Sequence, residues 1–472
     1  MRRTIGLMIL VAVIWFSGCS FAPRFKQPEV QVPQNFRFDS LQVDTLTTLR
    51  WWELFDDPQL KELIQIGLQN NQDVRIAAAR VEQARALHGF NKADLFPALN
   101  LAASGSRGDF AFMKLPRVSN NFYATAVLSW ELDFWGKYRN MTRAAKMEYL
   151  ASAYGMRSVQ ISLIAEIART YYLLLDYRER LNIARKTLRL REEALHIIQQ
   201  RFEKGIIPEI DLNQAQIQKA VAETAIPYYE RLAKKTENAL SVLLGRSPSD
   251  ITSQKTLDEL NLPPDIPPGL PSTLLLRRPD VVQQEHMLRA QLARVGVAQA
   301  MRIPSISLTG LLGLASGELN TLLESESGTW NIGANLVGPI FQFGKNLRRV
   351  DVEKARAEEA LRQYEKTILQ AFREVDDALV DIHTLKRELI AREEHFRAAK
   401  NAERLAMERY DKGVTSYLEV IETQRSAFEA ELALSQTRQQ LFSAYVSLYK
   451  ALGGGWISQA EEVNARSQGQ SQ

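Results

Sequence analysis

The apolar positions of the second half of the chain predict one very long helix. No proline follows Ile340, and apolar residues recur every three or four positions along the stripe Leu361, Tyr364, Ile368, Phe372, Val375, Leu379 and Ile382. A single apolar stripe of this period is typical of a coiled-coil helix. The first half is similar, because no proline interrupts Lys137 to Ile207. A helix of about 65 residues would be about 100 Å long.

Two other segments alternate between apolar and polar residues with a period of two, which predicts half-buried strands. The apolar positions of the first are Phe122, Ala124, Ala126, Leu128, Trp130 and Leu132. Those of the second are Trp330, Ile332, Ala334, Leu336 and Ile340. We expect their partner strands to begin near Leu99 and Ile306. Each strand would have about ten residues, the length of a tilted membrane-spanning strand.

Four such strands are too few to close a barrel within one chain. Every backbone polar group in a bilayer must be paired, so an open sheet cannot span it. Bacterial outer-membrane barrels have at least about eight strands. We therefore expect several chains to share one barrel, and three chains would supply about 12 strands. The alternative, a four-stranded sheet packed on soluble helices, leaves the long helices without a purpose.

An internal repeat organises the chain. The segment Arg201–Gly205 (RFEKG) matches Arg409–Gly413 (RYDKG) at an offset of 208 residues. The pair Gly136-Lys137 recurs at the same offset, and Asp73-Val74 recurs after 207 residues. A repeat of this length indicates two copies of one structural module. Gly205 and Gly413 each follow a long helix, so they are expected at the tips of two helical hairpins.

The repeat and the proline-rich stretches predict the organisation of the chain. In each half we expect a helical segment first, such as Gln59 to Lys92, then two strands, a very long helix and another helix. The predicted parts are a signal peptide (1–18), a lipid anchor with an extended N-terminal segment (19–57), the first repeat (58–245), a proline-rich connector (246–274), the second repeat (275–453) and a C-terminal tail (454–472).

The N-terminus predicts export and lipidation. Arg2 and Arg3 precede an apolar stretch from Ile5 to Phe16, the charge pattern of an export signal. Phe16-Ser17-Gly18-Cys19 resembles a bacterial lipobox, although Phe16 stands where Leu is preferred. Cys19 is the only cysteine in the chain, so it has no disulfide partner and is the expected lipidation site. An ordinary cleaved signal that happens to end near a cysteine is the alternative.

Composition narrows the class of protein. The formal net charge is only +4, without a basic run, so we expect no nucleic-acid partner. The five histidines form no metal-binding motif, and no nucleotide-binding or nucleophile motif is present. We therefore expect no enzyme, no metal and no cofactor other than a covalent lipid on Cys19. Ser20, rather than Asp, follows Cys19, which favours the outer membrane.

Nearly the whole chain resembles the outer membrane factor family (TolC/OprM-type), in particular its lipoprotein branch that serves RND efflux pumps. The segments that carry the resemblance are Cys19–Pro23, Trp51–Leu60, Asn70–Arg75, Ser129–Gly136, Leu276–Asp280, Pro304–Thr309, Pro339–Phe341 and Leu448–Trp456.

The resemblance implies an assembly and a location. It implies an α+β membrane protein, a homotrimer whose 12-stranded β-barrel, with four strands per chain, continues into a long α-helical coiled-coil barrel. The protein would be anchored by lipid in the cell outer membrane and would extend into the periplasm. Its partners would be a periplasmic adaptor (membrane fusion) protein that docks at the tips Gly205 and Gly413, and an inner-membrane RND pump. It would passively conduct small molecules to the exterior.

The resemblance also implies a periplasmic gate. The segment Tyr417–Glu422 is similar to the family segment that narrows the periplasmic entrance. Leu418 and Glu422 are four apart and share a helix face, Glu419 and Glu422 are three apart and also share one, and a trimer would turn each position into a ring. A carboxylate ring favours cations, and a Leu ring can gate by dewetting. The matching position of the first half contains Asp211. The alternative is that these glutamates line an ordinary solvated helix face.

Two other functions fit parts of the pattern. One is the exit duct of a type I protein secretion system, whose pump is an ABC transporter. The other is a structural coiled-coil lipoprotein of the periplasm. The lipobox and the Gly-Gly-Gly-Trp ending favour efflux over secretion, and the alternating strands argue against a purely structural coiled coil.

Overall fold

The computed structural model describes six stretches of the chain, residues 21–27, 36–37, 51–55, 57–109, 118–263 and 277–455. The predicted signal peptide and Cys19 lie outside these residues. The chain divides into two compact units. Unit 1 comprises 1–30, 79–154 and 283–366, and unit 2 comprises 31–78, 155–282 and 367–472. Each unit therefore takes segments from both halves of the sequence.

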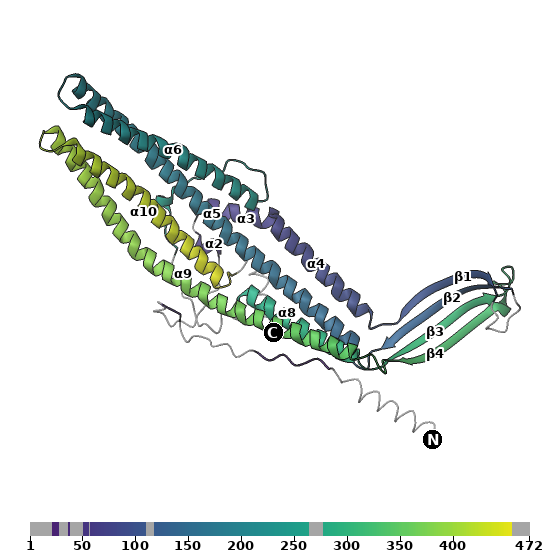
Figure 1. Ribbon diagram of the computed structural model, residues 1–472. Helices are drawn as coiled ribbons and strands as arrows, with labels where there is room; N and C mark the ends of the chain where they lie inside the picture. The colour runs from purple at the N-terminus through teal and green to yellow at the C-terminus, as the bar shows by residue number, and fades with distance from the viewer. Residues whose placement is uncertain are drawn as a thin grey trace. The chain divides into compact units, whose positions relative to one another are not determined.

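Unit 1 contains one antiparallel sheet of four strands (Figure 1). The strands lie in chain order, β1 (Ala98–Gly108), β2 (Ser119–Leu132), β3 (Ser305–Ser316) and β4 (Gly328–Val337). The central pair, β2 and β3, joins the two halves of the sequence through pairs such as Leu128 with Gly310. Strands β1 and β4 are the two edges.

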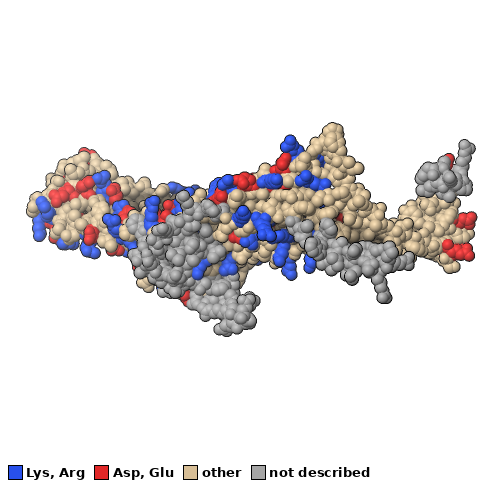
Figure 2. Space-filling model, turned by 90° about the horizontal axis from the view of Figure 1, so that it is seen from below, with Lys and Arg blue, Asp and Glu red and all other residues tan. Residues whose placement is uncertain are grey.

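The register gives the sheet one apolar face and one mixed face that carries polar side chains. One row across the four strands contains Leu101, Ala126, Leu312 and Trp330, and the neighbouring row contains Asn100, Val127, Leu311 and Asn331. Leu101, Leu312 and Trp330 are 83%, 68% and 73% exposed, so the apolar face is uncovered within one chain. Figure 2 shows the surface of the sheet almost free of charged side chains on the face in view, except at one tip. The predicted alternation is confirmed up to Leu336, whereas Ile340 lies beyond the end of β4 at Val337.

The long helices are also confirmed. α5 (Lys137–Glu203) and α9 (Lys345–Asp411) have 67 residues each. They are followed by α6 (Glu209–Leu243) and α10 (Tyr417–Ala451), with 35 residues each. The helices α4 (Gln72–Ala93) and α8 (Pro279–Ala300) have 22 residues each. The two halves of the chain thus fold into matching elements, and in unit 2 they form the hairpins α5–α6 and α9–α10 (Figure 1).

The first helical segment differs from the expectation. The sequence predicted one segment from Gln59 to Lys92, whereas the structure divides it into α3 (Pro58–Asn70) and α4. Asn71 between them has extended backbone angles, φ −61° and ψ 133°. Its side-chain oxygen accepts hydrogen bonds from the backbone N–H groups of Asp73 and Val74, at 2.8 and 3.2 Å. Asn71 therefore acts as an N-cap that starts a new helix.

The core of unit 2 holds the two hairpins together at their bases. The short helix α2 (Trp51–Leu54) packs there with α3, and aromatic side chains such as Tyr171, Phe442 and Tyr449 are fully buried. Asp57 caps α3 by accepting from the Gln59 N–H, and it also accepts the Tyr171 hydroxyl at 2.6 Å. Two single 3-10 turns, η2 (Leu257–Glu259) and η3 (Ser325–Ser327), lie in the connections.

Candidate functional site

The two hairpin turns of unit 2 are built alike. Gly205 and Gly413 have positive φ angles of 69° and 72°, which glycine adopts without strain. In the first turn the Ile206 N–H donates to the Arg201 carbonyl at 2.9 Å, and in the second Val414 donates to Arg409 at 2.9 Å. This six-to-one hydrogen bond satisfies a free carbonyl at each helix end. The structure thus places both predicted tip glycines in the turns.

Side chains from both hairpins meet just below the turns. The Arg201 guanidinium of α5 donates to the Asp411 carboxylate of α9 at 3.0 Å. The same guanidinium lies over the Tyr410 ring, 5.3 Å from its centroid, and Tyr410 contacts Tyr417 with ring centroids 5.1 Å apart. A small apolar cluster continues the contact with Ile198 and Val420. The two hairpins therefore form one joined end.

The predicted gate residues lie in the first two turns of the adjoining helix, α10. Leu418 is 60% exposed, so its side chain is free to face another copy or a passage. Glu419 accepts a hydrogen bond from the Thr415 hydroxyl and lies 3.8 Å from Arg409. Glu422 accepts from Arg425 at 2.7 Å. Both glutamates are paired with a nearby arginine, which weakens the field that a ring of free carboxylates would have.

Asp211 lies in the first turn of α6, half-buried near Tyr410 and Tyr417. Burial raises the pKa of the Asp211 carboxyl above its usual value. Burial also raises the pKa of Tyr417 to about 12, so this hydroxyl stays neutral at physiological pH. Asp211 therefore faces the hairpin contact that Arg201, Tyr410 and Tyr417 make.

Sequence reasoning did not identify Arg201, Tyr410 and Asp411 as members of this site, and it named Tyr417 only as the first residue of the gate segment. Their signal was present in the repeat, because RFEKG and RYDKG each contain a basic and an acidic residue. The Arg201 of one copy pairs with the Asp411 of the other, and the remaining Arg409 approaches Glu419. The duplication thus supplies charges of both signs to each tip.

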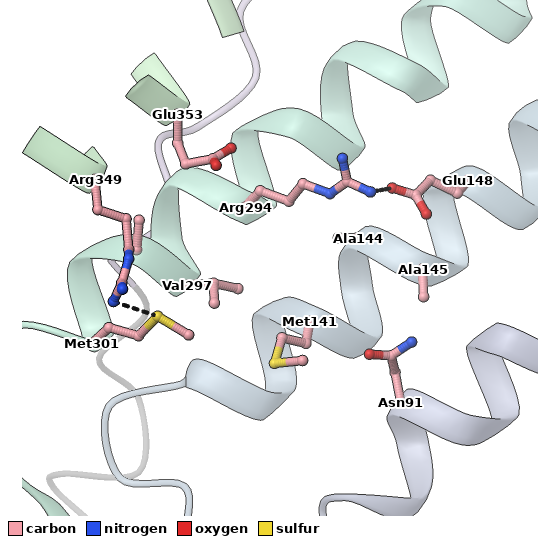
Figure 3. A pocket seen from close by; sticks show the side chains of 11 residues that line it. Asn91, Met141, Ala144, Ala145, Glu148, Arg294, Val297, Met301, Arg349 and Glu353 are labelled. Atoms are coloured by element: carbon pink, nitrogen blue, oxygen red, sulfur yellow. Dashed lines mark hydrogen bonds and ion pairs between the residues drawn. The ribbon is translucent and has the colours of Figure 1, made fainter. Parts of the chain in front are cut away.

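Unit 1 contains a pocket of about 540 Å³ between α4, α5, α8 and α9 (Figure 3). An ion pair between Arg294 and Glu148 lies on one side, and Arg349 donates to the Met301 sulfur at 3.4 Å. The apolar part of the lining includes Met141, Ala144 and Val297. The drawn side chains bring no nucleophile next to a base, so the arrangement offers no catalytic constellation.

In the part of the chain that the structure describes, nowhere do three or more His, Cys, Asp or Glu side chains gather closely enough to hold a metal ion. Among the same residues, no helix combines the length and apolar character that a membrane-spanning helix requires.

Comparison with known proteins gives consistent matches. The sequence profile of the family "Outer membrane efflux protein" matches residues 63–246 and 270–454. The chain is 35% identical over 470 residues to the probable efflux pump outer membrane protein TtgC of Pseudomonas putida, covering 97% of both chains. It is 34% identical to the outer membrane protein OprJ of Pseudomonas aeruginosa, covering 96% of this chain and 97% of OprJ.

A solved structure has the same fold. The CmeC outer membrane channel of Campylobacter jejuni superposes with a TM-score of 0.85 at 30% identity. The superposition covers 95% of this chain and 98% of CmeC. The four-stranded sheet and the paired long hairpins are therefore features that this chain shares with an outer membrane channel.

Proposed function

The chain belongs to the outer membrane efflux protein family, and from this premise we propose that three copies form the exit duct of a tripartite efflux system. The protein is an outer-membrane channel component of efflux. In the proposed assembly the sheets build a shared 12-stranded barrel, and the long helices extend it into the periplasm. Small molecules pass through it passively, so the protein catalyses no reaction and its partners supply the energy.

The observation that carries this proposal is the uncovered apolar face of an open sheet. Leu101, Leu312 and Trp330 share a row on that face, and the opposite face carries Asn100, Asn331 and other polar groups. A barrel with lipid outside and water inside needs this division of faces. Its edge strands must also be paired, because unpaired backbone groups are too costly in a bilayer. Pairing β1 of one copy with β4 of the next satisfies both edges.

The hairpin ends serve as the gate and as the docking site. The Arg201–Asp411 pair supports a closed resting arrangement of the two hairpins. Ile206 and Val414 occupy equivalent places beside the tip glycines and are 66% and 65% exposed. Such exposed apolar side chains suit contact with a partner protein. We assign this contact to a periplasmic adaptor, which links the duct to an inner-membrane RND pump.

The protein is anchored by lipid as well as by its strands. Cys19 follows an export signal and carries the acyl chains in this proposal. Its position directly before the extended N-terminal segment is the sequence support for this role.

Cysteine cross-linking tests the shared barrel. Cys19 is the only native cysteine, so introduced cysteines can be followed individually. Asn100→Cys in β1, combined on one chain with Asn331→Cys or Asn335→Cys in β4, should give covalent dimers and trimers on oxidation. Leu101→Cys combined with Asn335→Cys is the matched control, because these side chains lie on opposite faces of the sheet. Cross-linking in the control but in no same-face pair would contradict the barrel.

A photo-cross-linker at Ile206 or Val414 tests the partners in cells. Capture of an adaptor together with an RND pump is the expected result. Capture of an ABC transporter would instead assign the duct to type I protein secretion. If neither kind of pump were captured and no trimer formed, the proposal of an exit duct would be overturned.

A further inference from the structure

The segment Phe21–Gln27, which has no regular secondary structure, packs on α8 within unit 1. The Phe25 ring lies under the Arg289 guanidinium, 4.6 Å from its centroid. Three residues earlier, Ala22 lies against Gly296, so closely that a Cβ at position 296 would be 2.9 Å from the Ala22 Cα. Two contacts therefore attach this segment to one helix.

The contact residues are suited to this packing. Gly296 lies inside α8, where glycine is a poor helix former, so the close approach of Ala22 accounts for its missing side chain. Arg289 is oriented by an ion pair with Glu285 at 2.5 Å, which leaves the guanidinium face for Phe25. In the segment itself Ala22 and Phe25 are half-buried, whereas Arg24 and Lys26 are exposed.

The two contacts define the direction of the segment. Gly296 and Arg289 are seven residues apart in α8, which is about 10 Å along a helix axis. Ala22 and Phe25 are three residues apart, which is also about 10 Å in an extended chain. The segment therefore runs beside α8 and away from Ala300, the end of α8 that leads into β3 at Ser305. Going back toward the N-terminus, the chain heads for the sheet.

Chain length then limits where the lipid can be. Cys19 is three residues before Ala22, and three residues of chain span at most about 10 Å. Gly296 is only four residues, or about 6 Å, from the end of α8. Asn140 lies in the first turn of α5, the helix that follows β2. It borders the same contact, because a Cβ at Gly296 would be 2.7 Å from its side-chain nitrogen. Ala22 is thus held next to two helix ends that adjoin strands.

We propose that the face of α8 with Arg289 and Gly296 is a seat for the segment after Cys19, and that it holds the lipid level with the base of the sheet. The seat positions the acyl chains at the membrane leaflet where the apolar face of the barrel begins. The role of the lipid rests on the proposed lipidation of Cys19, whereas the seat does not depend on it. Arg289 and Gly296 act as positioning residues.

Limited trypsin digestion of the detergent-solubilised full-length protein tests the seat. The segment contains its own cleavage sites after Arg24 and Lys26. Arg289→Ala leaves these sites intact and should speed their cleavage about two- to fivefold, the factor that one exposed cation–π contact supplies. Gly296→Ala should speed it further, because the added Cβ displaces Ala22.

Two variants control for general effects. Arg294→Ala removes another arginine from α8 that pairs with Glu148 and not with the segment. Gly89→Ala adds a Cβ to a helical glycine with open space around it. Both should leave the cleavage rate at the wild-type value. Equal cleavage of Arg289→Ala, Gly296→Ala and wild type would overturn the seat.

A photo-cross-linker on either side of the seat tests the position of the lipid. At Arg302, beyond the sheet-facing end of α8, it should capture the tryptic peptide Cys19–Arg24 with its acyl chains. At Met287, toward the other end of α8, it should not. Preferential capture at Met287 would overturn the proposed direction. Mass spectrometry separates the two proposals, since a captured peptide without acyl chains would refute lipidation and leave the seat standing.

Discussion

Arg201 of α5 and Asp411 of α9 form an ion pair at 3.0 Å that joins the ends of the two hairpins. The residues are 210 positions apart in the sequence and come from different copies of the repeat. Their side chains are 30% and 53% exposed, so water weakens the pair but does not abolish it. The contact lies directly below both turns, where separation of the hairpins would break it.

Removal of this pair should favour the open channel. An exposed ion pair contributes about 0.2–1 kcal/mol, so Arg201→Ala should raise the open probability up to about fivefold. Single-channel recording in planar bilayers measures it. The double variant Arg201→Asp with Asp411→Arg should return toward wild type. Lys219→Ala is the control, because Lys219 pairs with Glu192 within one hairpin. If Lys219→Ala raised the open probability as much as Arg201→Ala, the Arg201–Asp411 pair would have no specific role in keeping the channel closed.

Neutralising Glu422 of α10 and neutralising its partner Arg425 should change the ion selectivity of the channel in opposite directions. Glu422→Gln leaves the Arg425 charge unbalanced, so we expect a weaker preference for cations. Arg425→Gln leaves Glu422 unbalanced and should strengthen that preference. Reversal potentials in a salt gradient measure both effects. Glu394→Gln, at an exposed position of α9, should have no effect. The same shift in both Glu422→Gln and Arg425→Gln would contradict a ring at this position.

Leu418 should narrow the same entrance by its size. Leu418→Ala removes an exposed apolar side chain from each copy, which should raise single-channel conductance without changing ion preference. The same recordings measure both quantities. Conductance equal to that of wild type would place the constriction elsewhere.

Ionisation of Asp176 should lower the stability of unit 2 as the pH rises. It is buried on α5, pairs with Arg180 at 2.8 Å and accepts from Ser435 of α10 at 2.7 Å. Burial raises its pKa above the ordinary 3.8 despite these partners. The folded state thus holds the proton to higher pH than the unfolded state, so stability falls as the pH rises through the interval from 3.8 to the raised pKa.

Thermal denaturation from about pH 2 to 7 checks the predicted fall in stability with rising pH. Asp176→Asn should remove the loss of stability above about pH 4. Asp250 provides a contrast, because its hydrogen bond with Lys234 lowers its pKa. Its contribution is therefore lost as the pH falls below 3.8, and Asp250→Asn should remove that loss. Identical pH profiles of wild type and Asp176→Asn would show that Asp176 does not titrate differently on folding.

Gly245 should tolerate substitution less well than Gly205. Both have φ near 70°, so alanine costs each about 1 kcal/mol of backbone strain. At Gly245 the new Cβ would also lie 2.3 Å from the Asn70 carbonyl oxygen, whereas nothing lies within 4 Å at Gly205. We expect Gly245→Ala to lower the melting temperature clearly more than Gly205→Ala. Equal decreases in melting temperature would mean that the close approach to Asn70 adds no destabilisation to the backbone strain.

The sequence alone determined the elements whose cause is local. The apolar stripe through Tyr364 and Ile368 predicted α9, and the alternation around Trp330 predicted β4, because both periods follow directly from backbone geometry. The offset of 208 residues predicted that both hairpins end at a glycine, and Gly205 and Gly413 have the same turn geometry. The break at Asn71 had a local cause too, a capping side chain that the helical pattern around it concealed.

Only the tertiary structure decided which distant side chains meet. Spacing alone leaves the partner of Arg201 open among the acids of its own tip, and the packing of the two hairpins brings Asp411 to it. The packing of α9 against α10 likewise brings Arg409 to 3.8 Å from Glu419 and thereby changes the charge of the predicted gate. Gly296 receives Ala22 across more than 270 residues of chain. Such contacts depend on how whole helices pack against each other, and no local period in the sequence contains that information.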